Sequence, residues 1–221
     1  MYTIIETYNN IPFDPALTPA KGFSCYIPEA SLLFDTGGDA AVLAGNLRTL
    51  GIDPAEIKTL VLSHDHWDHI GGLSAVLGKN PDLEVFVPAG FSEEKLAVIR
   101  EQARATVIGE WREIEDGIAS TGPCGGSIPE QSLAISTPEG FLIVSGCAHP
   151  HISRIIEIVK GHGPVFGAIG GFHTISEADR AALKTLAYLA PSHCTEDLEV
   201  IVKENSRRIH HGGAGIHHIL P

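Results

Sequence analysis

The sequence has few basic residues, no long apolar run and no cysteine pair of the C-x-x-C kind. Lys and Arg number 15 against 27 Asp and Glu, which gives a formal net charge of −12. Such a balance repels phosphate backbones and anionic lipid, and the bases do not cluster in any loop. The apolar runs are of strand length, too short to cross a membrane. We therefore expect neither a nucleic-acid partner nor a membrane partner.

The cysteines are also sparse and widely spaced, at Cys25, Cys124, Cys147 and Cys194. This spacing is typical of reduced thiols in a cytosolic protein rather than of a disulfide framework. Residues 1–10 contain neither a basic segment nor an apolar segment of the kind found in signal peptides. The expected location is the cytoplasm.

The chain of 221 residues is long enough for one large domain or two small ones. It contains no low-complexity linker and no internal repeat, so we expect one domain over residues 1–221. Strand and helix patterns alternate, which indicates an α/β fold. Strands are predicted over residues 2–8, 22–27, 31–35, 58–62, 83–87, 106–115, 131–136, 141–145, 164–169, 208–210 and 214–219. Helices are predicted over residues 39–50, 71–77, 91–105 with Ser92 as N-cap, 151–160, 176–189 and 195–203 with Thr195 as cap.

Histidine is abundant, with 12 in the chain, and one segment concentrates it. His64, His66, Asp68 and His69 follow directly after the predicted strand over residues 58–62. Imidazole and carboxylate groups are ligands of borderline divalent metals. His64 and His66 can bind one ion, while Asp68 and His69 can bind a second ion about 3.5 to 4 Å from the first. The alternative is a surface loop rich in His and Asp, but the position after an apolar strand favours a metal site.

The same segment carries a family resemblance. Residues 60–72 resemble the hallmark of the metallo-β-lactamase fold superfamily, and residues 33–37 resemble its upstream Asp-Thr-Gly strand. The resemblance implies an αβ/βα four-layer sandwich over the whole chain, with a metal pair at one edge of the two sheets. It also implies that His149 completes the first ion's ligands and that His193 completes the second ion's.

Four further segments narrow the resemblance to a subfamily. Residues 128–133, 146–149, 170–173 and 193–195 resemble the dihydropterin-methyl ribofuranosylaminobenzene phosphate synthase-like subfamily. That resemblance implies a transferase that joins a pterin-methyl diphosphate to an aryl amine and releases pyrophosphate.

One departure from the superfamily pattern concerns the carboxylate that bridges the two ions in most hydrolytic members. The acids in the corresponding interval are Glu157, Glu177 and Asp179, all in helical patterns. His173 stands there instead. We expect it to bind the second ion or to hydrogen-bond a water or substrate, the alternative being a structural histidine at a strand end.

Three acidic residues near the motif have predicted roles. Asp68 is expected to act as both metal ligand and catalytic residue. Asp65 is the second catalytic candidate, because it can orient an imidazole or accept a proton; the alternative is simple exposure. Asp35 is expected to fix a histidine tautomer, or else to form a turn at its strand end.

Four other residues are candidates for the surroundings of the site. Cys147 and Cys194 adjoin ligand motifs, and we expect them to pack behind the ligands rather than to react. Glu130 is expected to support the substrate or a loop, or to belong to a polar turn. Arg154 is placed to meet a phosphate at a helix N-terminus, or else is solvated.

The sequence therefore predicts a metal-dependent enzyme that acts on a small molecule with hydrolase-like chemistry. Two divalent ions are expected, zinc first, with iron or manganese as alternatives. The transferase reaction is the second hypothesis. A metal-binding or ligand-binding module without turnover is the third.

Overall fold

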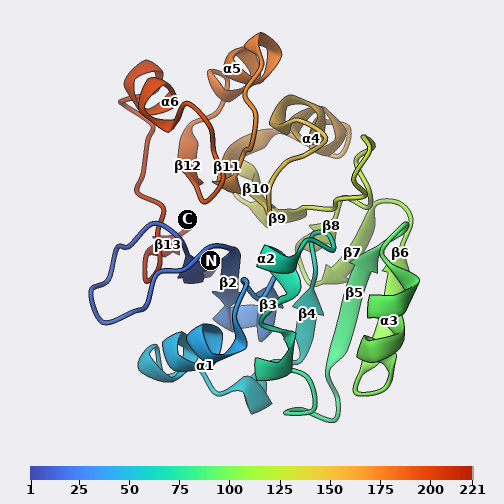
Figure 1. Cartoon of the computed structure of the whole chain (residues 1–221). Coiled ribbons are helices and arrows are strands. Elements are labelled where there is room, and N and C mark those ends of the chain that lie inside the picture. Colours follow the sequence, from blue (N-terminus) through green and yellow to red (C-terminus); the bar gives the residue numbers. More distant parts are fainter. Residues whose placement is uncertain (221) are drawn as a thin grey trace.

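A computed structural model describes residues 1–220 and contains two β-sheets that pack face to face (Figure 1). The first sheet has the order β13-β1-β2-β3-β4-β5-β6, and the second has the order β12-β11-β10-β9-β8-β7. The first comprises β1 Thr3–Asn9, β2 Phe23–Ile27, β3 Leu32–Phe34, β4 Thr59–Val61, β5 Glu84–Pro88, β6 Arg104–Ile108 and β13 His217–Ile219. The second comprises β7 Arg112–Glu115, β8 Ile118–Ser120, β9 Leu133–Thr137, β10 Gly140–Ser145, β11 Val165–Gly171 and β12 Tyr188–Ser192.

Helices cover the outer face of each sheet. In Figure 1, α4, α5 and α6 lie together at the top, while α1 and α3 lie at the bottom left and lower right. The helices are α1 Ala40–Thr49, α2 Trp67–Ile70, α3 Glu93–Arg100, α4 Ile152–Lys160, α5 Glu177–Leu183 and α6 Leu198–Glu204. No helix within residues 1–220 is long and apolar enough to cross a membrane.

Three buried clusters define the layers. The central cluster lies between the sheets and includes Phe34 and Val61 from one sheet and Val144 from the other. A second cluster packs the first sheet against α1 and α3, and a third packs the second sheet against α4, α5 and α6. The α/β fold and its four-layer arrangement, expected from the sequence, are thus confirmed.

The inner strands are apolar on both faces because both faces are covered. All residues of β3 and β4 are buried, and these two strands pair in parallel. Near-continuous apolar runs of this kind are typical of parallel sheets with covered faces. Helix α4 shows the other pattern: Ile152, Ile155, Ile156 and Val159 recur at helical spacing and face the third cluster.

Of the helix predicted over residues 71–77, only a short 3-10 helix, Leu73–Ala75, forms. Helix α2 begins earlier, at Trp67, and so carries the second half of the histidine motif. Gly71 ends α2 and Gly72 precedes the short 3-10 helix, and both glycines let two segments approach closely. A Cβ at Gly72 would lie 2.0 Å from the Thr36 carbonyl oxygen, and one at Gly71 would lie 2.3 Å from the carbonyl oxygen of Gly38. These glycines dock α2 against the end of β3.

Two predicted helices are too long, because strand pairing overrides their local pattern. Helix α3 has the predicted Ser92 N-cap but ends at Arg100, and β6 then pairs in parallel with β5. Helix α5 ends at Leu183, and β12 pairs in parallel with β11.

Three smaller predictions also need correction. Thr195 does not cap a helix, because its Oγ1 accepts a hydrogen bond from the Phe172 N–H, and α6 begins at Leu198. The strand predicted over residues 106–115 is divided between β6 and β7, which belong to different sheets. Of the two predicted C-terminal strands, β13 forms, while Ile209 makes only an isolated bridge with Leu189.

Asp179 joins α4 to α5, and we expect its loss to destabilise the protein. Its buried carboxylate accepts hydrogen bonds from the Ser176 and Ser153 N–H groups at 2.8 and 2.9 Å and pairs with His151. Although burial opposes ionisation, the hydrogen bonds from Ser176 and Ser153 lower the pKa of Asp179 to about 2. Asp179→Ala should lower the free energy of unfolding by about 3 kcal/mol in urea titrations at pH 7.

The pH dependence supplies a check on this prediction. A depressed carboxyl pKa stabilises the fold above its unfolded value of 3.8, and that stabilisation is lost as the pH falls through about 2. The difference between wild type and Asp179→Ala should therefore shrink from pH 4 to pH 2. An equal effect from the exposed control Asp82→Ala, or a difference independent of pH, would contradict this account.

Candidate metal centre

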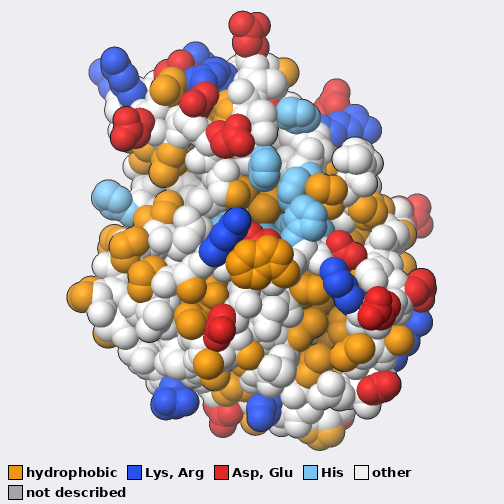
Figure 2. Space-filling model, viewed as in Figure 1, with side chains coloured by type: hydrophobic (Ala, Val, Ile, Leu, Met, Phe, Trp, Pro, Cys, Tyr) orange, Lys and Arg blue, Asp and Glu red, His pale blue; other side chains and the backbone are white. Residues whose placement is uncertain are grey.

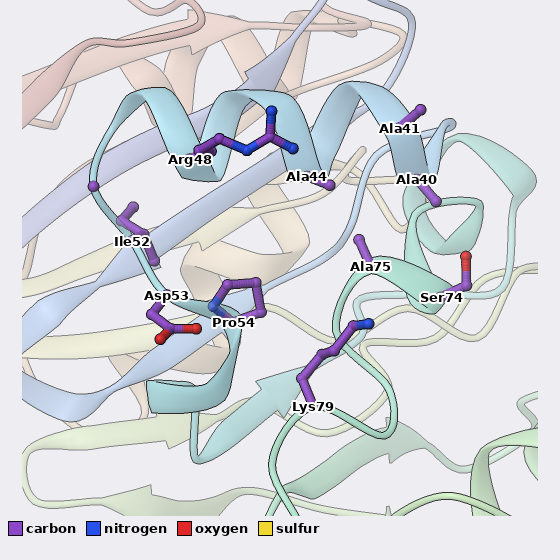
Figure 3. Close-up of a pocket in the computed structure, with 11 residues that line it drawn as sticks. Ala40, Ala41, Ala44, Arg48, Ile52, Asp53, Pro54, Ser74, Ala75 and Lys79 are labelled. Carbon is purple, nitrogen blue, oxygen red and sulfur yellow. The ribbon is translucent and has the colours of Figure 1, made fainter.

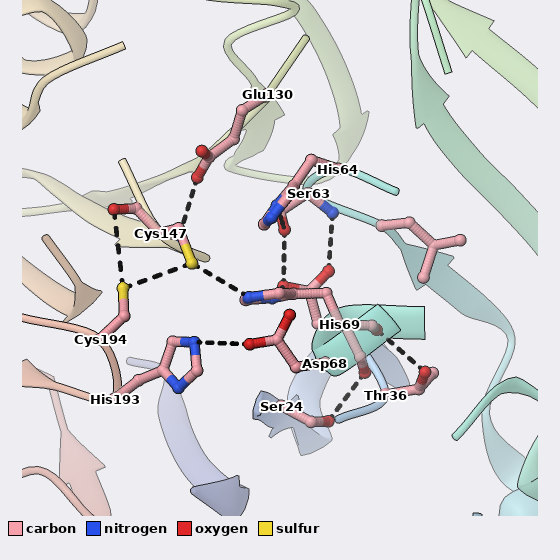
Figure 4. A network of polar contacts seen from close by, with 12 residues as sticks. Ser24, Thr36, Ser63, His64, Asp68, His69, Glu130, Cys147, His193 and Cys194 are labelled. Carbon is pink, nitrogen blue, oxygen red and sulfur yellow. Dashed lines mark hydrogen bonds and ion pairs between the residues drawn. The ribbon is translucent and has the colours of Figure 1, made fainter. Parts of the chain in front are cut away.

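The predicted ligands meet at one edge of the sandwich, although they come from three parts of the chain. The first segment follows β4 and runs into α2, the second follows β10 and the third follows β12. Figure 4 shows side chains from all three segments turned toward one another. Figure 2 shows histidine side chains gathered near the centre of one face of the molecule.

The first ligand group consists of His64, His66 and His149. Their ligand atoms all lie within 4.8 Å of one another. The three rings stand edge to face, with centroids 4.6 to 4.9 Å apart. Three imidazoles that converge in this way form a ligand set suited to zinc and similar ions.

The second ligand group consists of Asp68, His69 and His193. Their ligand atoms also lie within 4.8 Å of one another. The Asp68 Oδ2 atom is 3.7 Å from the His193 Nε2 atom (Figure 4). The two groups adjoin, because the His64 and His69 ring centroids are 4.2 Å apart.

Two buried nitrogens in these groups have no hydrogen-bond partner among the described residues. They are the Nε2 atoms of His64 and His193, one from each group. Burial, followed by the nearby His69, lowers the pKa of His64 to about 2 and that of His193 to about 3. Both rings are therefore neutral at pH 7 and present a lone pair. A buried nitrogen without a partner is costly, and a bound metal ion removes that cost. The residues fit divalent ions.

The other ring nitrogen of these histidines is held in place. In each of four histidines the Nδ1 atom contacts an oxygen atom of another side chain. In the first group, His64 contacts Ser63 Oγ at 2.9 Å and His149 contacts Glu130 Oε2 at 2.7 Å. In the second group, His69 contacts Asp35 Oδ2 at 2.7 Å and His193 contacts Asn10 Oδ1 at 2.8 Å. A partner at Nδ1 fixes the ring and leaves Nε2 as the ligand atom. Sequence reasoning missed two of these partners. Ser63 adjoins the motif, whereas Asn10 is 183 positions from His193 and gave no signal.

Asp35 ties the β3 end to the metal motif. Its carboxylate accepts hydrogen bonds from the Ser63 N–H and hydroxyl, both at 2.7 Å, as well as contacting His69. Burial raises the pKa of Asp35. Burial acts against the charge on His69, but the Asp35 carboxylate outweighs it and raises the pKa of His69. Asp35 therefore orients both the motif's backbone and one imidazole.

Glu130 holds the loop that carries His149. Its fully buried carboxylate accepts hydrogen bonds from the N–H groups of Cys147, Ala148 and His149, each at 2.8 Å. Burial acts against its ionisation, but the His149 hydrogen bond and the nearby His64 lower the pKa of Glu130 to about 2. A polar turn, the alternative considered from the sequence, does not describe this buried anchor.

Backbone strain also gathers at this edge. Asp35, Ala148, His173 and His193 have φ values of +56°, +58°, +39° and +53°. Left-handed conformations of residues other than glycine cost about 1 to 3 kcal/mol each and tend to occur at functional sites. Here they occur in the turns that follow β3, β10, β11 and β12, beside the ligand groups.

The two thiols lie among the ligand atoms rather than behind them. The Cys147 Sγ atom is 3.1 Å from His69 Nε2 and 3.3 Å from Cys194 Sγ. Cys147 forms one ligand-distance group with His64 and His69, and another with His193 and Cys194. Their placement differs from the packing role expected from the sequence.

Three other predicted site residues stand outside the ligand groups. The Asp65 carboxylate accepts the Ser92 N–H at 3.2 Å and lies 3.7 Å from Lys95 Nζ, so it faces α3. Arg154 is exposed and pairs with Glu157 at 2.9 Å. His173 lies beside His149, with ring centroids 5.0 Å apart, and its Nδ1 contacts the hydroxyl of the neighbouring threonine.

A separate hollow of about 650 Å³ lies beside α1 (Figure 3). It is lined by Ala44 and Arg48 of α1, by Asp53 and by Lys79. None of its lining residues belongs to a ligand group. Beside the ligand groups lies the exposed side chain of Trp67, the first residue of α2. The Lys21 Nζ atom is 5.6 Å from the centroid of its ring.

The fold and the ligand groups agree with the comparisons to known proteins. A family model described as the metallo-beta-lactamase superfamily matches residues 25–193, and the chain belongs to that superfamily. The chain is 27% identical to the 7,8-dihydropterin-6-methyl-4-(beta-D-ribofuranosyl)-aminobenzene-5'-phosphate synthase of Methanocaldococcus jannaschii. That alignment spans 281 positions and covers 96% of this chain and 94% of the relative. The resemblance inferred from the motifs is confirmed.

Solved structures show the same fold. Tm1679, described as a metal-dependent hydrolase of the beta-lactamase superfamily, matches with a TM-score of 0.84 and 22% identity, over 100% of this chain and 99% of that chain. The metallo-beta-lactamase fold protein YhfI from Bacillus subtilis matches with a TM-score of 0.68 and 13% identity, over 98% of each chain. Family membership and the named relative also support the expectation that the chain is an enzyme.

Proposed function

We propose that the protein is a metal-dependent hydrolase that acts on a small-molecule ester, lactone or phosphodiester. The first group, His64, His66 and His149, would hold one divalent ion. The second group, Asp68, His69 and His193, would hold another, with zinc the first expectation and iron or manganese the alternatives. The observation that carries this proposal is the pair of buried, neutral Nε2 atoms without a hydrogen-bond partner, one in each group.

The chain's own residues prepare the site before any substrate arrives. Asp35 and Glu130 orient imidazoles through Nδ1 and keep the strained loops in place. Bound divalent ions would lower the pKa of a water molecule toward about 7 and polarise a substrate carbonyl or phosphoryl oxygen. Among the six proposed ligands only Asp68 is a carboxylate, so a loaded site keeps positive charge for an anionic group.

The size of the chain favours a small substrate. The alignment with the Methanocaldococcus jannaschii synthase spans 281 positions, whereas this chain has 221 residues, so the relative contains segments that this chain lacks. At the site, Trp67 is 59% exposed and offers an apolar ring beside the ligands. An exposed ring and a nearby lysine suit a compact substrate with an apolar part and an anionic or acyl group.

Metal removal and reloading tests the proposed function. Chelated protein should hydrolyse no member of a panel of esters, lactones, phosphodiesters and thioesters, and addition of zinc, iron or manganese should restore turnover of at least one class. A metal present at 1,000 times its Kd should also raise the free energy of unfolding by about 4 kcal/mol. Turnover unchanged by chelation would contradict the proposal, and tight metal binding without turnover would favour a binding module.

The second candidate is a transferase that joins a pterin-methyl diphosphate to an aryl amine. Its support is the 27% identity to the Methanocaldococcus jannaschii synthase over 96% of this chain. The test is pyrophosphate release when metal-loaded protein is mixed with both substrates. Release that depends on the amine would favour the synthase over the hydrolase, and its absence at every metal loading would remove this candidate.

A further inference from the structure

The side chain that lies between the two ligand groups is Cys147. Its Sγ atom is within ligand distance of His64 and His69 and, in another group, of His193 and Cys194. No acidic residue occupies a comparable place, since the only carboxylate in the ligand groups of residues 1–220 is Asp68. Between the two ligand groups, where a bridging carboxylate would be expected, the structure has the Cys147 sulfur atom.

The direction of the Cys147 side chain is fixed by its surroundings. The residue is 3% exposed, and its N–H donates to Glu130 Oε1 at 2.8 Å. The left-handed conformation of Ala148 turns the loop immediately after it. The His69 ring is also held in position, because its Nδ1 atom contacts Asp35. Its Nε2 atom lies 3.1 Å from Cys147 Sγ. The Cys147 Sγ atom, in the loop after β10, and the His69 Nε2 atom, in α2, thus face each other (Figure 4).

We propose that the Cys147 thiolate is a metal ligand shared by both groups, in place of a bridging carboxylate. The proposal rests on the proposed two-ion centre and adds a ligand to it. When the ion binds, the thiol proton passes to a solvent base and the sulfur lone pair forms the metal bond. Thiolate ligands favour zinc and iron over magnesium, calcium and manganese. The chain is thereby predicted to select zinc or iron among the divalent ions.

X-ray absorption at the zinc edge tests this proposal without any measurement of activity. Protein loaded with two zinc ions under reducing conditions should show sulfur scattering at about 2.3 Å besides nitrogen and oxygen at about 2.0 to 2.1 Å. Cys147→Ser should lose the sulfur signal. Cys194→Ser should keep it, with one sulfur for every zinc. Cys25→Ser is the matched control, because Cys25 is buried in β2 and belongs to no ligand group, and it should keep the signal.

Each other outcome overturns the proposal. Zinc bound through nitrogen and oxygen alone would remove the thiolate ligand but leave the proposed hydrolase intact. If the Cys194→Ser spectrum shows one sulfur neighbour for every two zinc ions, Cys147 binds one ion only and is not shared. Failure to bind zinc at all would overturn both the ligand and the metal centre. If Cys147→Ser does not fold, the sulfur signal of Cys194→Ser still tests the proposal. Cys25 and Cys124 lie outside the ligand groups, so Cys147 is the remaining cysteine that can supply the sulfur in that variant.

Discussion

His64→Ala and His193→Ala should each reduce turnover by more than about 100-fold. Loss of a residue that merely orients a metal ligand costs about 10-fold to 100-fold in affinity or activity, so loss of the ligand itself should cost more. His64 belongs to the first group and His193 to the second, and each contributes a buried Nε2 atom that has no hydrogen-bond partner. Each variant should therefore lose one ion preferentially.

Elemental analysis and turnover, measured on the same samples, check this prediction. The wild type should retain two ions for each chain after dialysis, and each variant one. His217→Ala is the control, because His217 is exposed and belongs to no ligand group. Full metal content in either ligand variant, or an equal loss in His217→Ala, would show that these histidines do not hold the ions.

Glu130→Ala should be the most destabilising single change at the site. It would leave three buried N–H groups, those of Cys147, Ala148 and His149, without their acceptor. Each unsatisfied buried group costs about 1 to 3 kcal/mol, and removal of one partner of a buried charged pair costs about 3 to 5 kcal/mol. We expect the free energy of unfolding of the metal-free protein to fall by about 4 kcal/mol.

Urea titration of chelated protein measures that loss, and zinc affinity provides a second readout. Because His149 would lose the partner of its Nδ1, zinc binding should weaken by about 10-fold to 100-fold. Glu130→Gln keeps one acceptor oxygen and should lie between Ala and the wild type. Glu101→Ala, at an exposed glutamate, should leave both stability and affinity unchanged. A Glu130→Ala variant as stable as Glu101→Ala would show that the 147–149 loop does not depend on this carboxylate.

The sequence predicted the family, the four-layer fold and the residues that meet at the site because these depend on short local patterns. His64, His66, Asp68 and His69 lie within six positions after an apolar strand, and that spacing allows few arrangements. The elements that were mispredicted depend on distant partners. The helix predicted over residues 176–189 runs into Tyr188 and Leu189, which belong to β12 because that strand pairs with β11.

Among the site residues, too, roles that depend on distant partners could not be predicted from local patterns. Asp65 is adjacent in sequence to a ligand histidine, yet its carboxylate faces Ser92 and Lys95 of a later segment. Glu130 carries no local signal that distinguishes an anchor from a turn, because its partners are 17 to 19 positions away. The positions of the thiols depend on the strained turns at Ala148 and His193, whose positive φ values the sequence does not encode in a glycine.

Anomalous diffraction from crystals of the zinc-loaded protein locates the ions themselves. Two zinc peaks are expected, one among His64, His66 and His149 and the other among Asp68, His69 and His193. A single peak outside both groups, or none at full zinc loading, would contradict this expectation.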